Sequence, residues 1–187
     1  ATIGVTLLAG VEPGVIAGVS LSLALFLWRA SRPHAAVVGR VPETEHFRNV
    51  KRHKVLTDPR VLTIRIDESL TYLNARWLEE FVLEQVAEQP SVRHLVLMAS
   101  AVNAIDASAL ESLEAINSRL SDSGVTLHLS EVKGPVMDAL ERSHLLHHLT
   151  GKVWLSQNEA FSALIRLADA EDNPPATPDP WGPRGLI

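Results

Sequence analysis

The sequence predicts an α/β fold, a β-sheet with helices packed on it, preceded by a short apolar membrane helical segment. Three observations lead to this expectation. Apolar, β-branched runs alternate with segments whose apolar residues recur at helical spacing, which is typical of layered α/β domains. Residues 95–98, Leu-Val-Leu-Met, form a continuous apolar run, as in a strand buried on both faces. Residues 15–28 are apolar and carry no charge, and Arg29 closes them.

The predicted strands follow from short apolar or β-branched runs bounded by polar or turn residues. Residues 61–66, Val-Leu-Thr-Ile-Arg-Ile, are the clearest of these runs. Further strands are expected at residues 37–38, 70–73, 92–99, 125–129 and 153–155.

The predicted helices have recognisable beginnings and ends. Asn74 can cap a helix that runs to about residue 88, where Pro90 stops it. A second helix spans about residues 107–121 before Gly124, and a third, opened by Pro135, spans residues 136–142. Ser156 and Glu159 fit a capping box for a last helix, whose core residues are Phe161, Leu164, Ile165 and Ala168.

Residues 1–30 allow three interpretations. They can be a signal peptide, a buried core helix, or the end of one membrane segment followed by a tight turn at residues 12–14 and a short final membrane segment. The third is favoured because the basic residues follow the apolar run and no cleavage site is apparent. It makes residues 1–30 the end of a transmembrane region, and the chain a fragment of a longer protein.

Charge divides the rest of the chain. Residues 29–60 hold eight Lys or Arg against three acidic residues, whereas residues 61–187 hold nine against eighteen. Residues 31–60 are therefore expected to be a basic juxtamembrane linker with the first strand, on the cytoplasmic side and close to membrane lipids; a merely solvated linker is the alternative. Residues 61–170 form the main body of the domain, and the proline-rich residues 171–187 are expected to be disordered. The absence of cysteine excludes disulfides and thiolate-bound metals.

Three stretches carry a family resemblance. Residues 31–34 and 39–50 resemble the linker of bacterial SulP transporters. Residues 101–110, Ala-Val-Asn-Ala-Ile-Asp-Ala-Ser-Ala-Leu, are similar to the signature loop and helix start of the STAS domain of that family, and residues 131–136 also resemble it. The resemblance implies the cytoplasmic STAS domain of a secondary anion transporter, commonly a dimer, which regulates or supports assembly. The expected partners are the remainder of the membrane domain and a second copy, with no nucleic acid, in the cell inner membrane.

Asp106 and Ser108 are the candidate regulatory residues, for contact with a phosphate or a partner. STAS domains related to anti-sigma-factor antagonists carry a phosphorylated Ser directly after this Asp, but Ala107 occupies that position here. A phosphate on Ser108 would lie in the first turn of a helix, where backbone N–H groups favour an anion. The alternative is that Asp106, or Ser108 together with Glu111, simply caps the helix.

No other group of residues predicts catalysis. The chain has no G-x-S-x-G motif, no glycine-rich phosphate loop and no paired carboxylates in an obvious site, so no enzyme activity and no cofactor are expected. His144, His147 and His148 could bind a metal if helical, but a solvated helix end is favoured and no metal site is expected.

Two functions from different classes remain. The first is the regulatory or assembly STAS domain of a SulP-type anion transporter of the sulfate or bicarbonate class. The second is a soluble STAS signalling module of the anti-sigma-factor-antagonist type, which binds a protein kinase or regulator. The apolar residues 1–30 favour the first, because the second leaves them unexplained.

Overall fold

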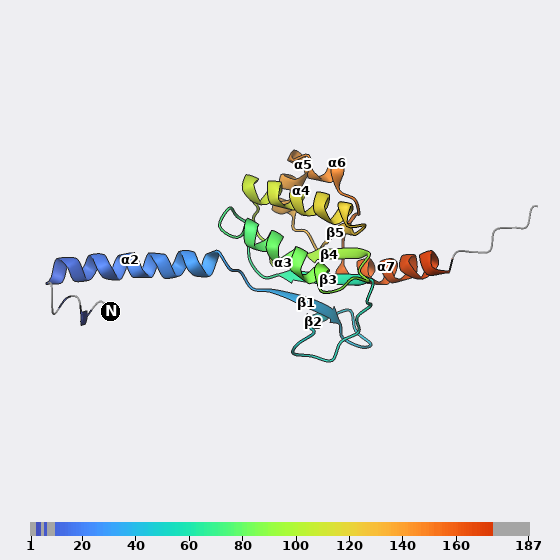
Figure 1. Cartoon of the computed structure of the whole chain (residues 1–187), viewed down its shortest axis with the longest axis horizontal. Coiled ribbons are helices and arrows are strands. Elements are labelled where there is room, and N and C mark those ends of the chain that lie inside the picture. The colour runs from blue at the N-terminus through green and yellow to red at the C-terminus, as the bar shows by residue number, and fades with distance from the viewer. Residues whose placement is uncertain (1–2, 5, 7–9, 174–187) are drawn as a thin grey trace, which may run out of the picture.

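A six-stranded mixed sheet forms the centre of the domain, in the order β2-β1-β3-β4-β5-β6 (Figure 1). The structure, a computed structural model, describes residues 3–4, 6 and 10–173. Strands β3 to β6 are parallel, whereas β1 is antiparallel to both β2 and β3. The strands are β1 (Ala35–Arg40), β2 (Phe47–Asn49), β3 (Val61–Ile66), β4 (His94–Met98), β5 (Thr126–Ser130) and β6 (Val153–Trp154).

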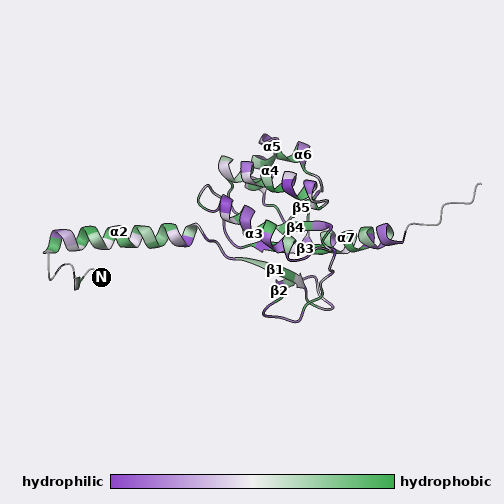
Figure 2. Cartoon of the chain, in the orientation of Figure 1, coloured by the Kyte–Doolittle hydropathy of each residue, from purple (hydrophilic) through white to green (hydrophobic). Residues whose placement is uncertain are grey.

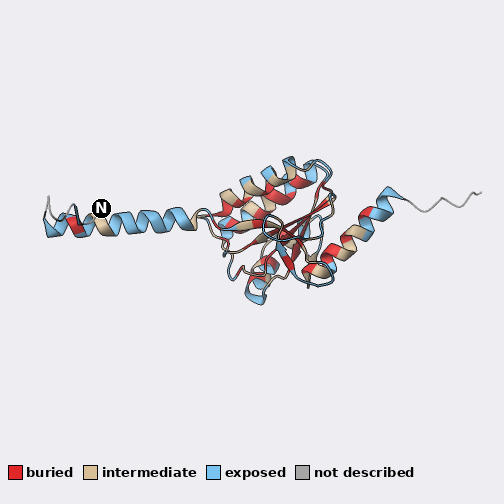
Figure 3. Ribbon diagram, turned by 90° about the horizontal axis from the view of Figure 1, so that it is seen from below, coloured by how far each residue is buried: buried red, intermediate tan, exposed pale blue. Residues whose placement is uncertain are grey.

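Helices cover both faces of this sheet, which confirms the predicted α/β class (Figure 1). One face carries α3 (Ala75–Ala87), α4 (Ala107–Asp122), α5 (Gly134–Arg142) and α6 (Leu145–His148). The other face carries α7 (Gln157–Asp172), which extends beyond the sheet (Figure 3).

The two faces have different cores because alternate strand residues point to opposite sides. On the α3–α4 face the strands contribute aliphatic side chains, including Leu62, Leu97 and Leu127. On the α7 face, Phe161 and Leu164 of the helix pack on strand residues of β1, β3 and β4. Polar residues also lie beneath α7, because the fully buried Gln157 donates to Thr63 Oγ1 (2.9 Å) and accepts from Ser130 Oγ (2.6 Å).

Predicted helices match the observed ones closely, and the strands less closely. The four predicted helices of the domain are present with ends shifted by a few residues, and Ser156 caps α7 by accepting from the Glu159 N–H at 3.1 Å. The predicted strand at residues 70–73 is wrong. Leu70 forms only an isolated bridge with Ile105, and the chain then turns into α3. Strand β2 and helix α6 were not predicted, and β1 is longer than residues 37–38.

The N-terminal apolar segment forms α2 (Val11–Ala30), which projects away from the sheet (Figure 2). The expected break at residues 12–14 is wrong, since Pro13 lies in the first turn, where its missing N–H costs nothing. The chain breaks instead at Gly10, whose φ of 98° suits glycine. The helix is longer than the short segment predicted.

Among the described residues, α2 is the one helix long and apolar enough to cross a membrane. Its 20 residues reach a mean hydropathy of 1.7 over the most apolar window, and 6% of that window is buried. At 1.5 Å per residue it spans about 30 Å, the thickness of the hydrocarbon core. Within the described structure, α2 is therefore not buried in the core of the domain. Residues 171–187 were expected to be disordered, but Glu171 and Asp172 are helical and end α7. Residues 174–187 lie outside the described residues.

Candidate functional site: the strand ends around Asp106

The carboxyl ends of the parallel strands lie beside the exit of α2. Because β1 is antiparallel to β3, its first residue, Ala35, pairs with Ile66 at the end of β3. His34, just before β1, is bonded to Asp67 twice: the Asp67 N–H donates to the His34 carbonyl at 3.0 Å, and His34 Nδ1 lies 2.7 Å from Asp67 Oδ2. If α2 crosses a membrane, this edge of the sheet faces it.

Asp67 also holds the side chain of Arg65, which donates through Nε (2.6 Å) and Nη2 (3.0 Å) to the two carboxylate oxygens. Partial burial by itself would raise the pKa of the Asp67 carboxyl. The hydrogen bonds from Arg65 and His34 outweigh that effect, so the pKa lies below its usual value. The carboxylate that ties the linker to the sheet is therefore ionised at neutral pH.

Asp106 joins two loops at this edge. Its Oδ1 accepts from the Ala109 N–H at 2.9 Å, which caps α4. Its Oδ2 accepts from the Tyr72 N–H at 2.8 Å, in the loop that leads from β3 to α3. Of the two N-caps that the sequence allowed for this helix, the structure contains the cap by Asp106. The alternative, a capping box of Ser108 with Glu111, is not formed.

The same two loops are joined again next to Asp106. Ser69 Oγ accepts from the backbone N–H groups of Asn103 (3.3 Å) and Ala104 (3.2 Å). The Leu70 N–H donates to the Ala104 carbonyl at 3.0 Å, in the bridge that replaces the predicted strand. From the β5–α5 loop, Lys133 Nζ donates to Asn103 Oδ1 at 2.7 Å. Three loops after three neighbouring strands therefore form one surface, the edge where open α/β sheets bind ligands.

Ser108 lies on this surface but is not bonded to Asp106. It is exposed in the first turn of α4, and no side-chain hydrogen bond from it occurs among the described residues. Ala107 is exposed beside it and has no hydroxyl. Asp106 uses both carboxylate oxygens as acceptors from backbone N–H groups, so the arrangement offers a capped helix start and a lysine.

The three histidines near residue 146 lie at the two ends of α6. His144 precedes the four-residue α6, and His147 and His148 end it, all exposed. Across the described part of the chain, no three His, Asp or Glu side chains come close enough to hold a metal ion.

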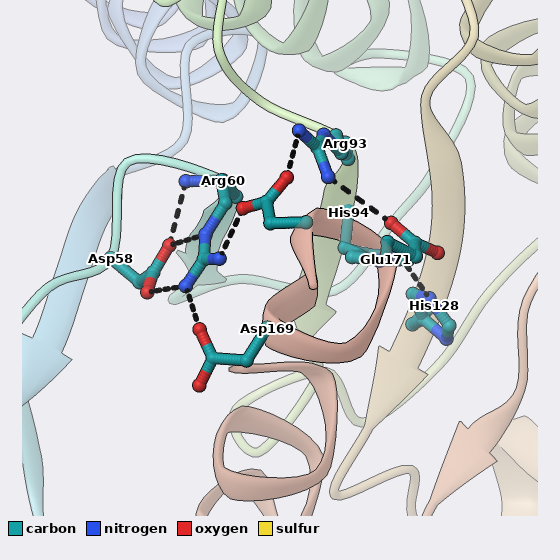
Figure 4. Close-up of polar contacts among 8 residues, drawn as sticks. Asp58, Arg60, Arg93, His94, His128, Asp169 and Glu171 are labelled. Atoms are coloured by element: carbon teal, nitrogen blue, oxygen red, sulfur yellow. Dashed lines mark hydrogen bonds and ion pairs between the residues drawn. The ribbon is translucent and has the colours of Figure 1, made fainter. Parts of the chain in front are cut away.

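A second polar cluster lies at the opposite edge of the sheet, where α7 ends (Figure 4). Arg60 forms ion pairs with Asp58 (2.8 Å), Asp169 (2.7 Å) and Asp172 (2.7 Å). Arg93 forms two more, with Asp172 at 2.6 Å and with Glu171 at 3.4 Å. Hydrogen bonds from Arg60 and then Arg93 hold the pKa of Asp172 below its usual value. We call these six residues the α7 clasp, because they fix the end of the helix to the starts of β3 and β4.

Two buried histidines lie under the clasp (Figure 4). His128 Nδ1 accepts from the Lys152 N–H at 3.0 Å and the Trp154 Nε1–H at 3.3 Å, and its Nε2 lies 3.4 Å from His94 Nδ1. Burial, followed by the charges of His94 and Lys152, lowers the pKa of His128 to about 4, and burial also lowers the pKa of His94. Both rings are therefore neutral at pH 7, and His94 Nε2 is buried with no hydrogen-bond partner among the residues that the structure describes.

Sequence reasoning missed both the clasp and the histidine pair. The signal for the pair was present, because His94 and His128 alternate with leucines and so share one face of adjacent strands. The clasp joins residues more than a hundred positions apart, Arg60 with Asp169 and Asp172, and no local pattern reveals such a pairing.

Comparison with known proteins agrees with this architecture. The family model described as "STAS domain" matches residues 53–160, more than half of the chain. Sulfate transporter 1.3 of Arabidopsis thaliana is 32% identical over 173 residues, which cover 85% of this chain and 26% of that protein. The chain thus spans about a quarter of the length of this curated relative.

Solved structures show the same fold. The murine Solute Carrier 26 family member A9 anion transporter, in its inward-facing state, matches with a TM-score of 0.74 at 17% identity, over 89% of this chain and 28% of that one. A putative anti-sigma factor antagonist from Thermotoga maritima matches with a TM-score of 0.51 at 21% identity, over 59% of this chain and 92% of that one. The chain belongs to the STAS domain family and is the STAS portion of a protein related to sulfate transporters of the SulP type.

Proposed function

We propose that this chain is the cytoplasmic regulatory and assembly domain of a SulP-type secondary anion transporter of the sulfate or bicarbonate class. In this proposal α2 is the last membrane-spanning helix of a multi-pass protein in the cell inner membrane. The remainder of that membrane domain is the main partner, and a second copy of the protein completes a homodimer.

The observation that carries the proposal is the pairing of Ala35 with Ile66. Helix α2 ends at Ala30 and β1 begins at Ala35, so the ends of the parallel strands lie directly after the membrane exit. The pairing supports a position of the surface around Asp106 on the side of the domain that the membrane domain contacts in this proposal. The contact between His34 and Asp67 supports the arrangement, because it bonds the linker to the loop after β3. The same loop reaches Tyr72, whose N–H donates to Asp106.

Within this proposal, Asp106 organises a contact surface and Ser108 presents a hydroxyl on it. Tyr72 is 68% exposed next to Asp106, so its ring and hydroxyl are accessible for contact with a partner. The signalling alternative is less well supported. Ala107 lacks the hydroxyl that a phosphorylated antagonist needs, and α2 would have no role in a soluble protein.

The test is uptake of labelled sulfate and labelled bicarbonate by cells that express the full-length protein, with and without residues 37–187. We expect uptake of one anion, and a clear reduction when the domain is deleted. Membrane-inserted protein that takes up neither anion would contradict the proposed substrate class. Uptake unchanged by the deletion would contradict the regulatory role.

A point variant sharpens the test of the surface. Asp106→Ala removes one helix cap and the bond to Tyr72, whereas Ser156→Ala removes a comparable cap from α7. We expect the first variant to change uptake at equal protein abundance and the second to leave it unchanged. Equal effects of both would indicate that only the stability of the domain matters.

A further inference from the structure

A group of basic side chains lies at the end of β2 and in the turn after it, and one of them, Arg48, donates to the Phe47 carbonyl at 3.0 Å. Arg48, Lys51, Arg52, His53 and Lys54 are exposed, and we call residues 48–54 the basic loop. Among the described residues, none of its four Lys and Arg side chains forms an ion pair, although nine ion pairs occur elsewhere in that part of the structure. The basic loop therefore presents uncompensated positive charge.

The topology turns this charge toward the exit of α2. Strand β1 leads away from α2, and the antiparallel β2 returns, so the turn after β2 begins on the side of the hairpin nearer α2 (Figure 1). The Val50 N–H donates to the Val37 carbonyl at 3.2 Å, two residues from the start of β1. The opposite turn of the hairpin carries the exposed Glu43 and Glu45. The hairpin is thus basic near the membrane helix and acidic at its far end.

The basic loop is also held in place. The Lys51 N–H donates to Asn49 Oδ1 at 2.8 Å, and the Arg52 and His53 N–H groups donate to the Asn49 carbonyl at 3.0 and 3.1 Å. After the loop, Leu56 is bonded to Arg40 in both directions, at 2.7 and 3.0 Å. A turn fixed at both ends loses little conformational entropy when its side chains meet a surface.

We propose that the basic loop docks on the anionic lipid headgroups of the membrane leaflet at the C-terminal end of α2, the leaflet that faces the domain. This inference rests on the proposed function, because it requires α2 to cross the membrane. The loop is a second contact, separate from Arg29 and Arg32, which lie at the end of α2 itself. Cations within a Debye length of about 10 Å of an anionic leaflet are attracted to it. Docking at this point would fix the rotation of the domain about the axis of α2.

The experiment uses the whole chain in lipid nanodiscs. Because the chain has no cysteine, His53→Cys provides a unique site for a fluorescent donor, and the acceptor is carried on lipid headgroups. Energy transfer is measured in phosphatidylcholine alone and with about 30% phosphatidylglycerol, at low and at about 1 M salt, where the Debye length is about 3 Å. We expect transfer to rise with the anionic lipid and to fall back at high salt.

Two matched variants test which charges are responsible. Arg52→Glu with Lys54→Glu should lower the ratio of docked to undocked domain at least about 25-fold, because each cation near an anionic surface contributes about fivefold. Arg142→Glu with Arg166→Glu makes the same change in net charge at exposed positions on α5 and α7 and should retain the effect. Thermal unfolding checks that both variants keep the fold.

Failure of the inference and failure of the proposed function are distinguishable. Extraction at alkaline pH and protease protection report whether α2 spans the bilayer. If α2 spans it and energy transfer is the same in neutral and anionic lipid, or both double variants lose it equally, docking of the basic loop is refuted while the membrane assignment stands. If α2 does not span the bilayer, both fail together.

Discussion

Acid should weaken the domain through His128 before its carboxylates titrate. His128 is 4% exposed, and its Nδ1 accepts two hydrogen bonds, so the ring fits this network only when that nitrogen carries no proton. Its pKa is lowered from 6.5 to about 4 in the folded protein. Between about pH 6.5 and pH 4 the ring is therefore protonated in the unfolded chain and neutral in the folded chain. The free energy of unfolding falls as the pH falls through this range.

The magnitude follows from the two pKa values. The difference between 6.5 and about 4 corresponds to a limit of about 3 kcal/mol, of which about 2 kcal/mol is lost between about pH 7 and pH 5. Urea unfolding of residues 31–173, followed by circular dichroism at several pH values, measures this loss. The carboxylates of Asp67 and Asp172, whose pKa values are lowered, lose their contribution only at more acid pH.

His128→Asn is the control. The Asn side-chain oxygen can accept from the same two donors but does not titrate, so the variant starts from lower stability with a flatter pH dependence. The difference between the two curves reports the proton linkage of His128 together with its coupling to His94. Parallel curves between about pH 7 and pH 5 would refute the reasoning, because the buried ring would then contribute no proton linkage.

Three further substitutions test the packing. Leu97→Asp should unfold the domain, since the side chain is 1% exposed and an unpaired buried charge costs several kcal/mol; a melt like that of the native protein would show that Leu97 is not in the core. Gly39→Ala should lower the melting temperature, because its Cβ would lie 2.6 Å from the Leu56 carbonyl oxygen, whereas Gly134→Ala has open space and should not; equal melts would contradict the close crossing. Arg60→Gln should speed proteolysis at the end of α7 by opening the clasp, and an unchanged digestion rate would show that the clasp does not hold the helix.

The sequence predicted elements whose own residues determine them. The strand at β4 is a continuous apolar run, and α4 and α7 have both helical spacing and a capping side chain. Strand β2 is Phe-Arg-Asn, which has no strand pattern of its own and forms because β1 offers an unpaired edge. The segment at residues 70–73 is the converse case. Its apolar run suggests a strand, but Leu70 forms only an isolated bridge with Ile105, and the residues after it turn into α3.

In the candidate site, too, the sequence predicted the locally determined feature and missed those that depend on tertiary contacts. The cap by Asp106 was among the expectations, because the position of an N-cap depends on local sequence. Its second bond, to Tyr72, depends on how two loops meet at the end of the sheet. The position of this surface beside α2 depends on the register of β1 with β3, which no pattern in either strand specifies.

The hydrogen bonds of Gln157 determine where α7 can lie along the sheet. A helix held only by aliphatic contacts can slide by one turn and find similar neighbours, but Gln157 has one partner on β3 and one on β5. Sliding would leave a buried amide and two buried hydroxyl groups unpaired, at a cost of about 1–3 kcal/mol each. The bonds of Gln157 thus allow one position of α7 along the sheet. In that position the ion pairs of the clasp form at the other end of the helix. Helix α7 therefore always ends at the same point, at the edge of the sheet opposite α2.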